Sequence, residues 1–149
     1  NGNVCVHTHA TTDVVVDVSG YTPSDDGLRS LVPARLLDSR GGAETVDGVS
    51  AGIGRRPAGS VTEVSVTDRG GVPSDAAAVV LDVISVLPDA AGFLTVYPCG
   101  TPRPLASSLN SAAGQVIANS VFTQVGVDGK VCIYTLSAVD IVVDVTGHT

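Results

Sequence analysis

The chain has 149 residues, a net charge of −7 and a pI near 4.5, with 44% hydrophobic and 15% charged residues. Such a length suits one ordinary domain, and the low charge with a mean hydropathy of +0.35 excludes an intrinsically disordered chain. The acidic balance argues against a nucleic-acid partner, and no apolar stretch approaches the ~20 residues of a membrane span.

The residue types favour β-strands. Val is the commonest residue, 17 Gly and 8 Pro divide the chain into short segments, and the residues that favour helices are rarely clustered. The composition therefore predicts an all-β fold.

The two ends of the chain repeat each other. Each residue from Asn3 to Thr22 aligns without a gap with the residue 127 positions later, and 10 of the 20 pairs are identical. Chance does not produce this agreement. We therefore predict that residues 1–22, the N-terminal segment, are the closing strands of a preceding repeat.

The valines of this segment are candidates for strand donation. A strand pair severed from its own sheet exposes apolar side chains and unpaired backbone groups. It would fold back on this chain, complete a neighbour by strand addition, or remain as a severed pair without a role. The candidate donors are Val4, Val6, Val14, Val16 and Val18.

Residues 23–31 are polar and rich in turn formers, which predicts a linker, and residues 32–149 then form one complete repeat. Seven or so short strands at this spacing predict a β-sandwich of about seven to nine strands, preferred over a barrel. Residues 76–87 are the most apolar and predict a central strand covered on both faces. Val127-Asp128-Gly129-Lys130 predicts a hairpin turn. The predicted strands are 32–40, 60–68, 76–87, 92–98, 115–125, 130–136 and 140–146.

Several sequence blocks resemble a known repeat module. They read VPARLLDSR at 32–40, GVP at 71–73, AAAVVLDV at 76–83, GFLTVYP at 92–98, SSLN at 107–110 and VVDVTG at 142–147. In this order they resemble a tandem repeat module of secreted and surface-exposed actinobacterial proteins. The resemblance implies an extracellular β-rich module and transfers no catalytic signature. The closing motif of that family ends in an aromatic residue, which Tyr21 matches and His148 does not.

Three cysteines in such a chain predict an oxidising, extracellular setting. Cys99 and Cys132 lie 33 residues apart within one repeat. A disulfide between them would stabilise the fold by roughly 3–4 kcal/mol, and two buried thiols are the alternative. No spacing typical of a metal site is present. Cys5 aligns with Cys132, so it is free, paired outside this chain, or competing for Cys99.

The recurring acidic residues favour structural ion pairs. Asp13 and Asp17 recur as Asp140 and Asp144, and residues four apart on a strand lie about 13 Å from each other. This separation is too large for one calcium ion or one acid–base pair, so we expect each carboxylate to cap a turn or pair with Arg.

Two histidines are candidate metal ligands. His7 and His9 would share one face of a strand, where a third ligand would complete a zinc or copper site. The repeat places Tyr134 and Leu136 at these positions, which favours two surface residues and no metal site.

Two further charged clusters are evident. Arg35, Asp38 and Arg40 form one, and Asp68 with Arg69 forms the other. Ion pairs beneath loops explain both, and contacts to a carbohydrate or anion are the alternative, in which Arg35, Arg40 and Tyr97 would touch the ligand. No nucleophile motif and no phosphate-binding loop is present, so we expect no catalytic residue, no cofactor and no metal.

Together these features predict a non-enzymatic structural module, extracellular or on the cell surface. It would form a tandem-repeat stalk, an adhesive shaft or a surface fibre by head-to-tail strand complementation, with itself as partner. The alternative is an accessory module of a larger secreted protein that binds carbohydrate or cell wall.

Overall fold

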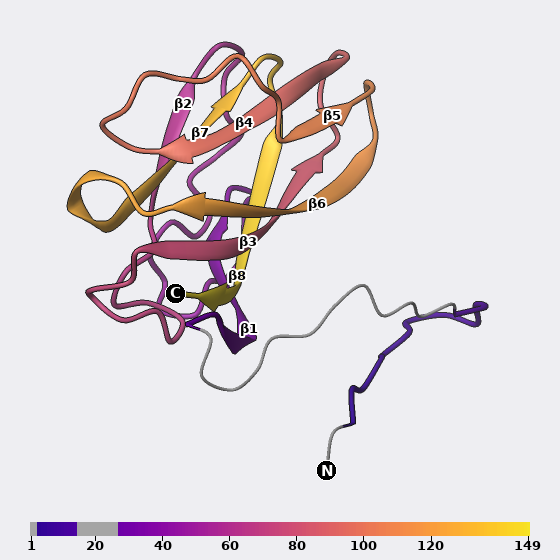
Figure 1. The fold of residues 1–149 in the computed structure, drawn as a ribbon. Coiled ribbons are helices and arrows are strands. Elements are labelled where there is room, and N and C mark those ends of the chain that lie inside the picture. Colours follow the sequence, from indigo (N-terminus) through magenta and orange to yellow (C-terminus); the bar gives the residue numbers. More distant parts are fainter. Residues whose placement is uncertain (1–2, 15–26) are drawn as a thin grey trace.

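The computed structural model describes residues 3–14 and 27–149 (Figure 1). Eight strands form two four-stranded antiparallel sheets that pack face to face. Within the described residues the only helical element is one 3₁₀ turn, η1 (Val127–Gly129). The predicted all-β sandwich is therefore confirmed.

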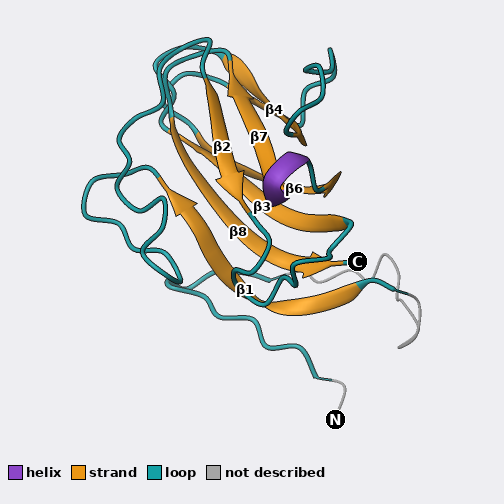
Figure 2. Ribbon diagram, turned by 90° about the vertical axis from the view of Figure 1, so that its left-hand side faces the viewer, coloured by secondary structure: helices purple, strands orange, loops and turns teal. Residues whose placement is uncertain are grey.

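The first sheet has the order β1-β8-β3-β6, and β1, β8 and β3 lie side by side in Figure 2. The second sheet has the order β2-β7-β4-β5. Every pair of neighbouring strands is antiparallel. The strands are β1 (Arg29–Asp38), β2 (Val61–Ser65), β3 (Ala78–Val86), β4 (Gly92–Pro98), β5 (Leu109–Ser111), β6 (Val116–Gln124), β7 (Lys130–Thr135) and β8 (Asp140–His148).

Alternate residues of the strands build the core between the two sheets. Because side chains of a strand alternate between its faces, every second Val, Leu or Ile points inward. Leu81 and Val83 of β3 and Val143 of β8 are fully buried and meet Val64 and Ile133 of the second sheet in one cluster. Burying each such side chain contributes about 1.5–3 kcal/mol.

The predicted strands all occur, with three differences. β1 begins at Arg29, inside the predicted linker, because Arg29 pairs with His148 of β8. β3 is central as predicted, but Val80 and Ile84 on its outer face are only half-buried, since no further layer of the described residues covers them. β5 was not predicted as a strand, because three residues carry no readable alternation.

The predicted hairpin at residues 127–130 is wrong, although the turn itself is present. Asp128 (φ 57°) and Gly129 (φ 68°) adopt the left-handed conformation that an Asp-Gly turn favours. However, β6 pairs with β3 in the first sheet, whereas β7 pairs with β2 and β4 in the second. The turn therefore carries the chain from one layer to the other.

The described part of the N-terminal segment forms no strand. Residues 3–14 are exposed throughout, and the valines Val4, Val6 and Val14 are 90%, 59% and 51% exposed. Val16 and Val18 lie outside the described residues. Strands equivalent to β7 and β8 need β1, β2, β3 and β4 as neighbours, and in this chain residues 130–135 and 140–148 already fill those positions.

Candidate functional site

The predicted cluster of Arg35, Asp38 and Arg40 lies at the end of β1 and in the residues that follow it. The carboxylate of Asp38 is 1% exposed and lies 2.6 Å from Nη2 of Arg40 and 3.3 Å from Nη1 of Arg35. The hydrogen bond from the Arg40 side chain lowers the pKa of Asp38 below its ordinary value. Asp38 therefore remains ionised, with a partner on either side.

The carboxylates of β8 pair with arginines, as predicted. Arg35 and Asp144 are cross-strand partners, and the guanidinium donates from Nε to Oδ1 (2.8 Å) and from Nη2 to Oδ2 (3.1 Å). Asp140 accepts hydrogen bonds from Arg55 (2.9 Å) and from the hydroxyl of Ser39 (2.8 Å). Asp13, the counterpart of Asp140, is exposed, and Asp17 lies outside the described residues.

Arg69 is the most enclosed cation in the described residues, at 9% exposure, and its partner was not predicted. Nε and Nη2 donate to both carboxylate oxygens of Asp47 (2.6 and 2.8 Å) rather than to Asp68. The same guanidinium donates to the backbone carbonyls of Leu36 (2.8 Å), Ser65 (2.7 Å) and Val49 (3.0 Å). It thereby ties β1 and β2 to the loop around Asp47.

Acid is expected to destabilise the fold through Asp47. The hydrogen bond from Arg69 lowers the pKa of this carboxyl from 3.8 to about 2. Because the pKa is lower in the folded state, the ionised group stabilises the fold above the unfolded pKa, and this contribution is lost as the pH falls from about 5 to about 2. Urea unfolding across this range will show a smaller acid-induced loss for Asp47→Asn than for the wild type.

The matched control is Asp75→Asn, since Asp75 is exposed and makes no ion pair among the described residues. This variant should follow the wild-type pH dependence. An equal acid loss in Asp47→Asn and wild type would contradict the assignment.

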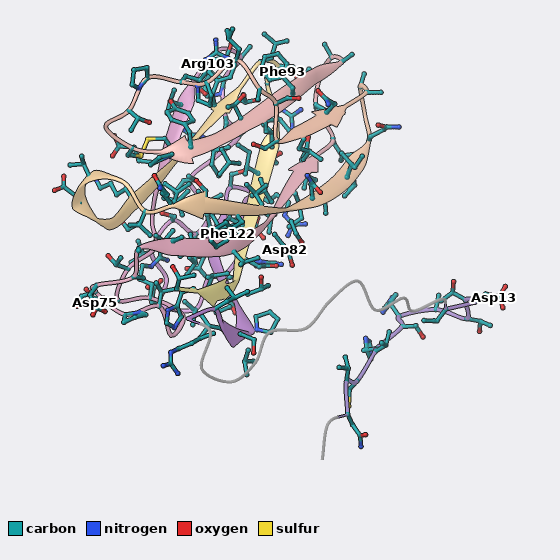
Figure 3. The ribbon with its side chains drawn as sticks, in the orientation of Figure 1. Asp13, Asp75, Asp82, Phe93, Arg103 and Phe122 are labelled. Atoms are coloured by element: carbon teal, nitrogen blue, oxygen red, sulfur yellow. A yellow bond between two sulfur atoms is a disulfide. The ribbon has the colours of Figure 1, made fainter. Side chains whose placement is uncertain are left out.

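The second sheet carries the disulfide. Cys99 and Cys132 are bonded, which confirms the predicted pair, whereas Cys5 is free and exposed. Tyr97, 7% exposed, packs against the disulfide together with Tyr134. The guanidinium of Arg103 lies 3.9 Å from the centre of the Tyr134 ring. Arg103 and Phe93 are labelled at the top of Figure 3.

The predicted ligand contacts are not brought together. Arg35 lies on β1 of the first sheet and Arg40 lies just after that strand, and they form ion pairs with Asp144 and Asp38. Tyr97 belongs to β4 of the other sheet and is buried beside the disulfide. These three side chains therefore do not form one ligand-binding surface.

His7 and His9 are exposed. In residues 3–14 and 27–149, no three His, Cys, Asp or Glu side chains lie close enough to hold a metal ion. The part of the chain that the structure describes also has no helix long and apolar enough to cross a membrane.

A scan of the chain against protein-family models finds no match, and a search of curated proteins finds none either.

Proposed function

We propose that this chain is a non-enzymatic, extracellular structural module that builds a tandem-repeat stalk or a surface fibre by head-to-tail strand complementation. The observation that carries the proposal is the internal repeat. Residues 3–8 and 13–21 align with Lys130–Thr135 and Asp140–His148, which are β7 and β8 of the sandwich.

The repeated positions include those that hold β7 and β8 in place. Ile141, Val143 and Val145 of β8 are fully buried, and Val14, Val16 and Val18 occupy the same positions of the N-terminal segment. The pairs Asp17/Asp144 and Cys5/Cys132 repeat the acceptor for an arginine and the cysteine of the disulfide. A unit that accepts the segment would bury its valines and satisfy Asp17 with its own Arg35.

The accepting unit would be a different one in which the β7 and β8 positions are open, either the body of another repeat or a second copy whose own residues 130–148 have moved out of the sandwich. In this chain the positions of β7 and β8 are filled, and the described residues 3–14 remain exposed outside any strand. Strand addition from one unit to the next is a heterologous contact, and such contacts continue into open filaments when the rotation between units does not close a ring.

An extracellular location is supported by the disulfide, because disulfides persist in oxidising compartments. The resemblance to surface-exposed actinobacterial repeats points the same way. A structural role is supported by the charged residues, because Arg35, Arg40, Arg55 and Arg69 are each engaged by at least one aspartate.

Electron microscopy of the native chain tests the proposal, with Val14→Asp as the disrupting variant. Wild type is expected to form particles or filaments with a regular axial repeat. Val14→Asp places a charge where the aligned Ile141 is fully buried, and should remain as single units. Leu105→Asp is the matched control, because Leu105 is 97% exposed and lies outside the repeat. Isolated globules of wild type, or equal assembly of wild type and Val14→Asp, would contradict the proposal.

A further inference from the structure

The four sheet edges are protected to very different degrees. Edge strands expose unpaired backbone groups, and proteins guard them with Pro, charges, irregular register or short length. β1 carries Pro33 and two register shifts, β2 has five residues including Glu63, and β5 has three residues. β6 has nine residues without Pro or charge and pairs with β3 in unbroken register. β6 is therefore the edge strand with no feature that prevents pairing with another strand.

The free backbone groups of β6 belong to its even-numbered residues. At the two ends of the β3–β6 ladder, the N–H of Leu87 donates to Gln115 (2.8 Å) and the N–H of Val125 donates to Ala77 (2.9 Å). Hydrogen-bonded pairs alternate along an antiparallel ladder, so the odd-numbered residues of β6 bond to β3. The residues that direct N–H and C=O away from β3 are Val116, Ala118, Ser120, Phe122 and Gln124.

The same five side chains lie on the outer face of the first sheet, because their register partners on β3 do. Val116 and Phe122 are each 63% exposed. Phe122 is paired with Val80, and Ala118 with Ile84, so apolar side chains of two strands adjoin at this edge. Figure 3 labels Phe122 together with Asp82, the register partner of Ser120.

We propose that β6 pairs with β6 of a second copy of this chain, antiparallel and about a two-fold axis through Ser120. This register uses the whole strand and places Phe122 opposite Ala118 of the second copy, a large side chain against a small one. Val116 meets Gln124, and Ser120 meets its own counterpart. Each facing pair of even-numbered residues exchanges two backbone hydrogen bonds, and the two first sheets become one continuous sheet.

The self-complementary register favours a second copy as the partner, and the uncharged strand permits it. The chain carries a net charge of −7, which opposes self-association over most of its surface. The edge strand β6 has no charged residue, so the two copies bring no like charges together along the strand itself. The contact uses no residue of the N-terminal segment, so it is independent of strand complementation and would join two stalks side by side.

The test measures the molecular mass of the full chain against concentration by sedimentation equilibrium. Ser120→Asp places two added carboxylates at the axis beside Asp82, so it should weaken pairing at least about tenfold. Ser74→Asp, at an exposed loop position, is the matched control and should pair like wild type. Circular dichroism checks that each variant is folded. An equimolar mixture of Ser120→Asp and Ser120→Lys should restore the pair, because opposite charges then meet on the axis.

A wild-type chain that stays single at every concentration would overturn the proposal, and so would undiminished pairing of folded Ser120→Asp. Val14→Asp distinguishes this contact from strand complementation. It should leave β6 pairing intact, so its loss of mass to that of one chain would also overturn the proposal.

Discussion

Replacing Arg69 with Met is expected to lower the free energy of unfolding by about 3 kcal/mol. The guanidinium satisfies the Asp47 carboxylate and three backbone carbonyls from within the fold, at 9% exposure. Met fills much of the volume but donates no hydrogen bond, so these acceptors lose their partner. Urea unfolding of wild type and variant, followed by far-UV circular dichroism, measures the difference.

Arg103→Met is the control for removing an arginine. Arg103 is exposed and stacks on Tyr134, a contact that contributes about 0.5–1 kcal/mol at such a site. If the two variants lost equal stability, the hydrogen bonds of Arg69 would not be what holds β1, β2 and the Asp47 loop together.

Removing the disulfide by Cys99→Ala with Cys132→Ala is expected to cost roughly 3–4 kcal/mol, an effect at least as large as that of Arg69→Met. The bond closes a loop of 33 residues and thereby restricts the unfolded chain. Thermal unfolding of the double variant should therefore begin well below that of wild type.

Cys5→Ala provides the comparison for this variant, because the Cys5 thiol is free and exposed. Its midpoint should equal that of wild type under conditions where the chain is single. A double variant as stable as wild type would mean that the packing of Tyr97 and Tyr134 holds β4 and β7 together without the bond.

Local patterns in the sequence predicted the strands, whereas the pairing of distant segments was harder to predict. A strand was predicted at 60–68, and the structure places Val61–Ser65 there, with Val64 buried and Val61 on the exposed face. The Asp128-Gly129 turn was predicted from conformational preference, but no local signal shows which sheet receives the next strand. The hairpin prediction failed for that reason.

The same distinction applies to the charged clusters: contacts between residues close in the sequence could be predicted, and contacts between distant residues could not. Arg35 and Asp38 are three residues apart, so their cluster was readable from the sequence. Asp47 lies 22 residues from Arg69 in a loop without a repeated counterpart, so its role required the structure. In the N-terminal segment a strand-like sequence does not form a strand, because residues 3–14 have no neighbouring strand in this chain.

Amide hydrogen exchange of Val4, Val6 and Val14 tests strand complementation most directly, because these residues are exposed in the single chain. Their exchange is expected to slow at least about tenfold when the chain is concentrated enough to assemble, because backbone N–H groups then enter a sheet. The Val14→Asp variant should exchange rapidly at every concentration. Rapid exchange in the assembled wild type, or equal protection in the dilute single chain, would contradict complementation between units.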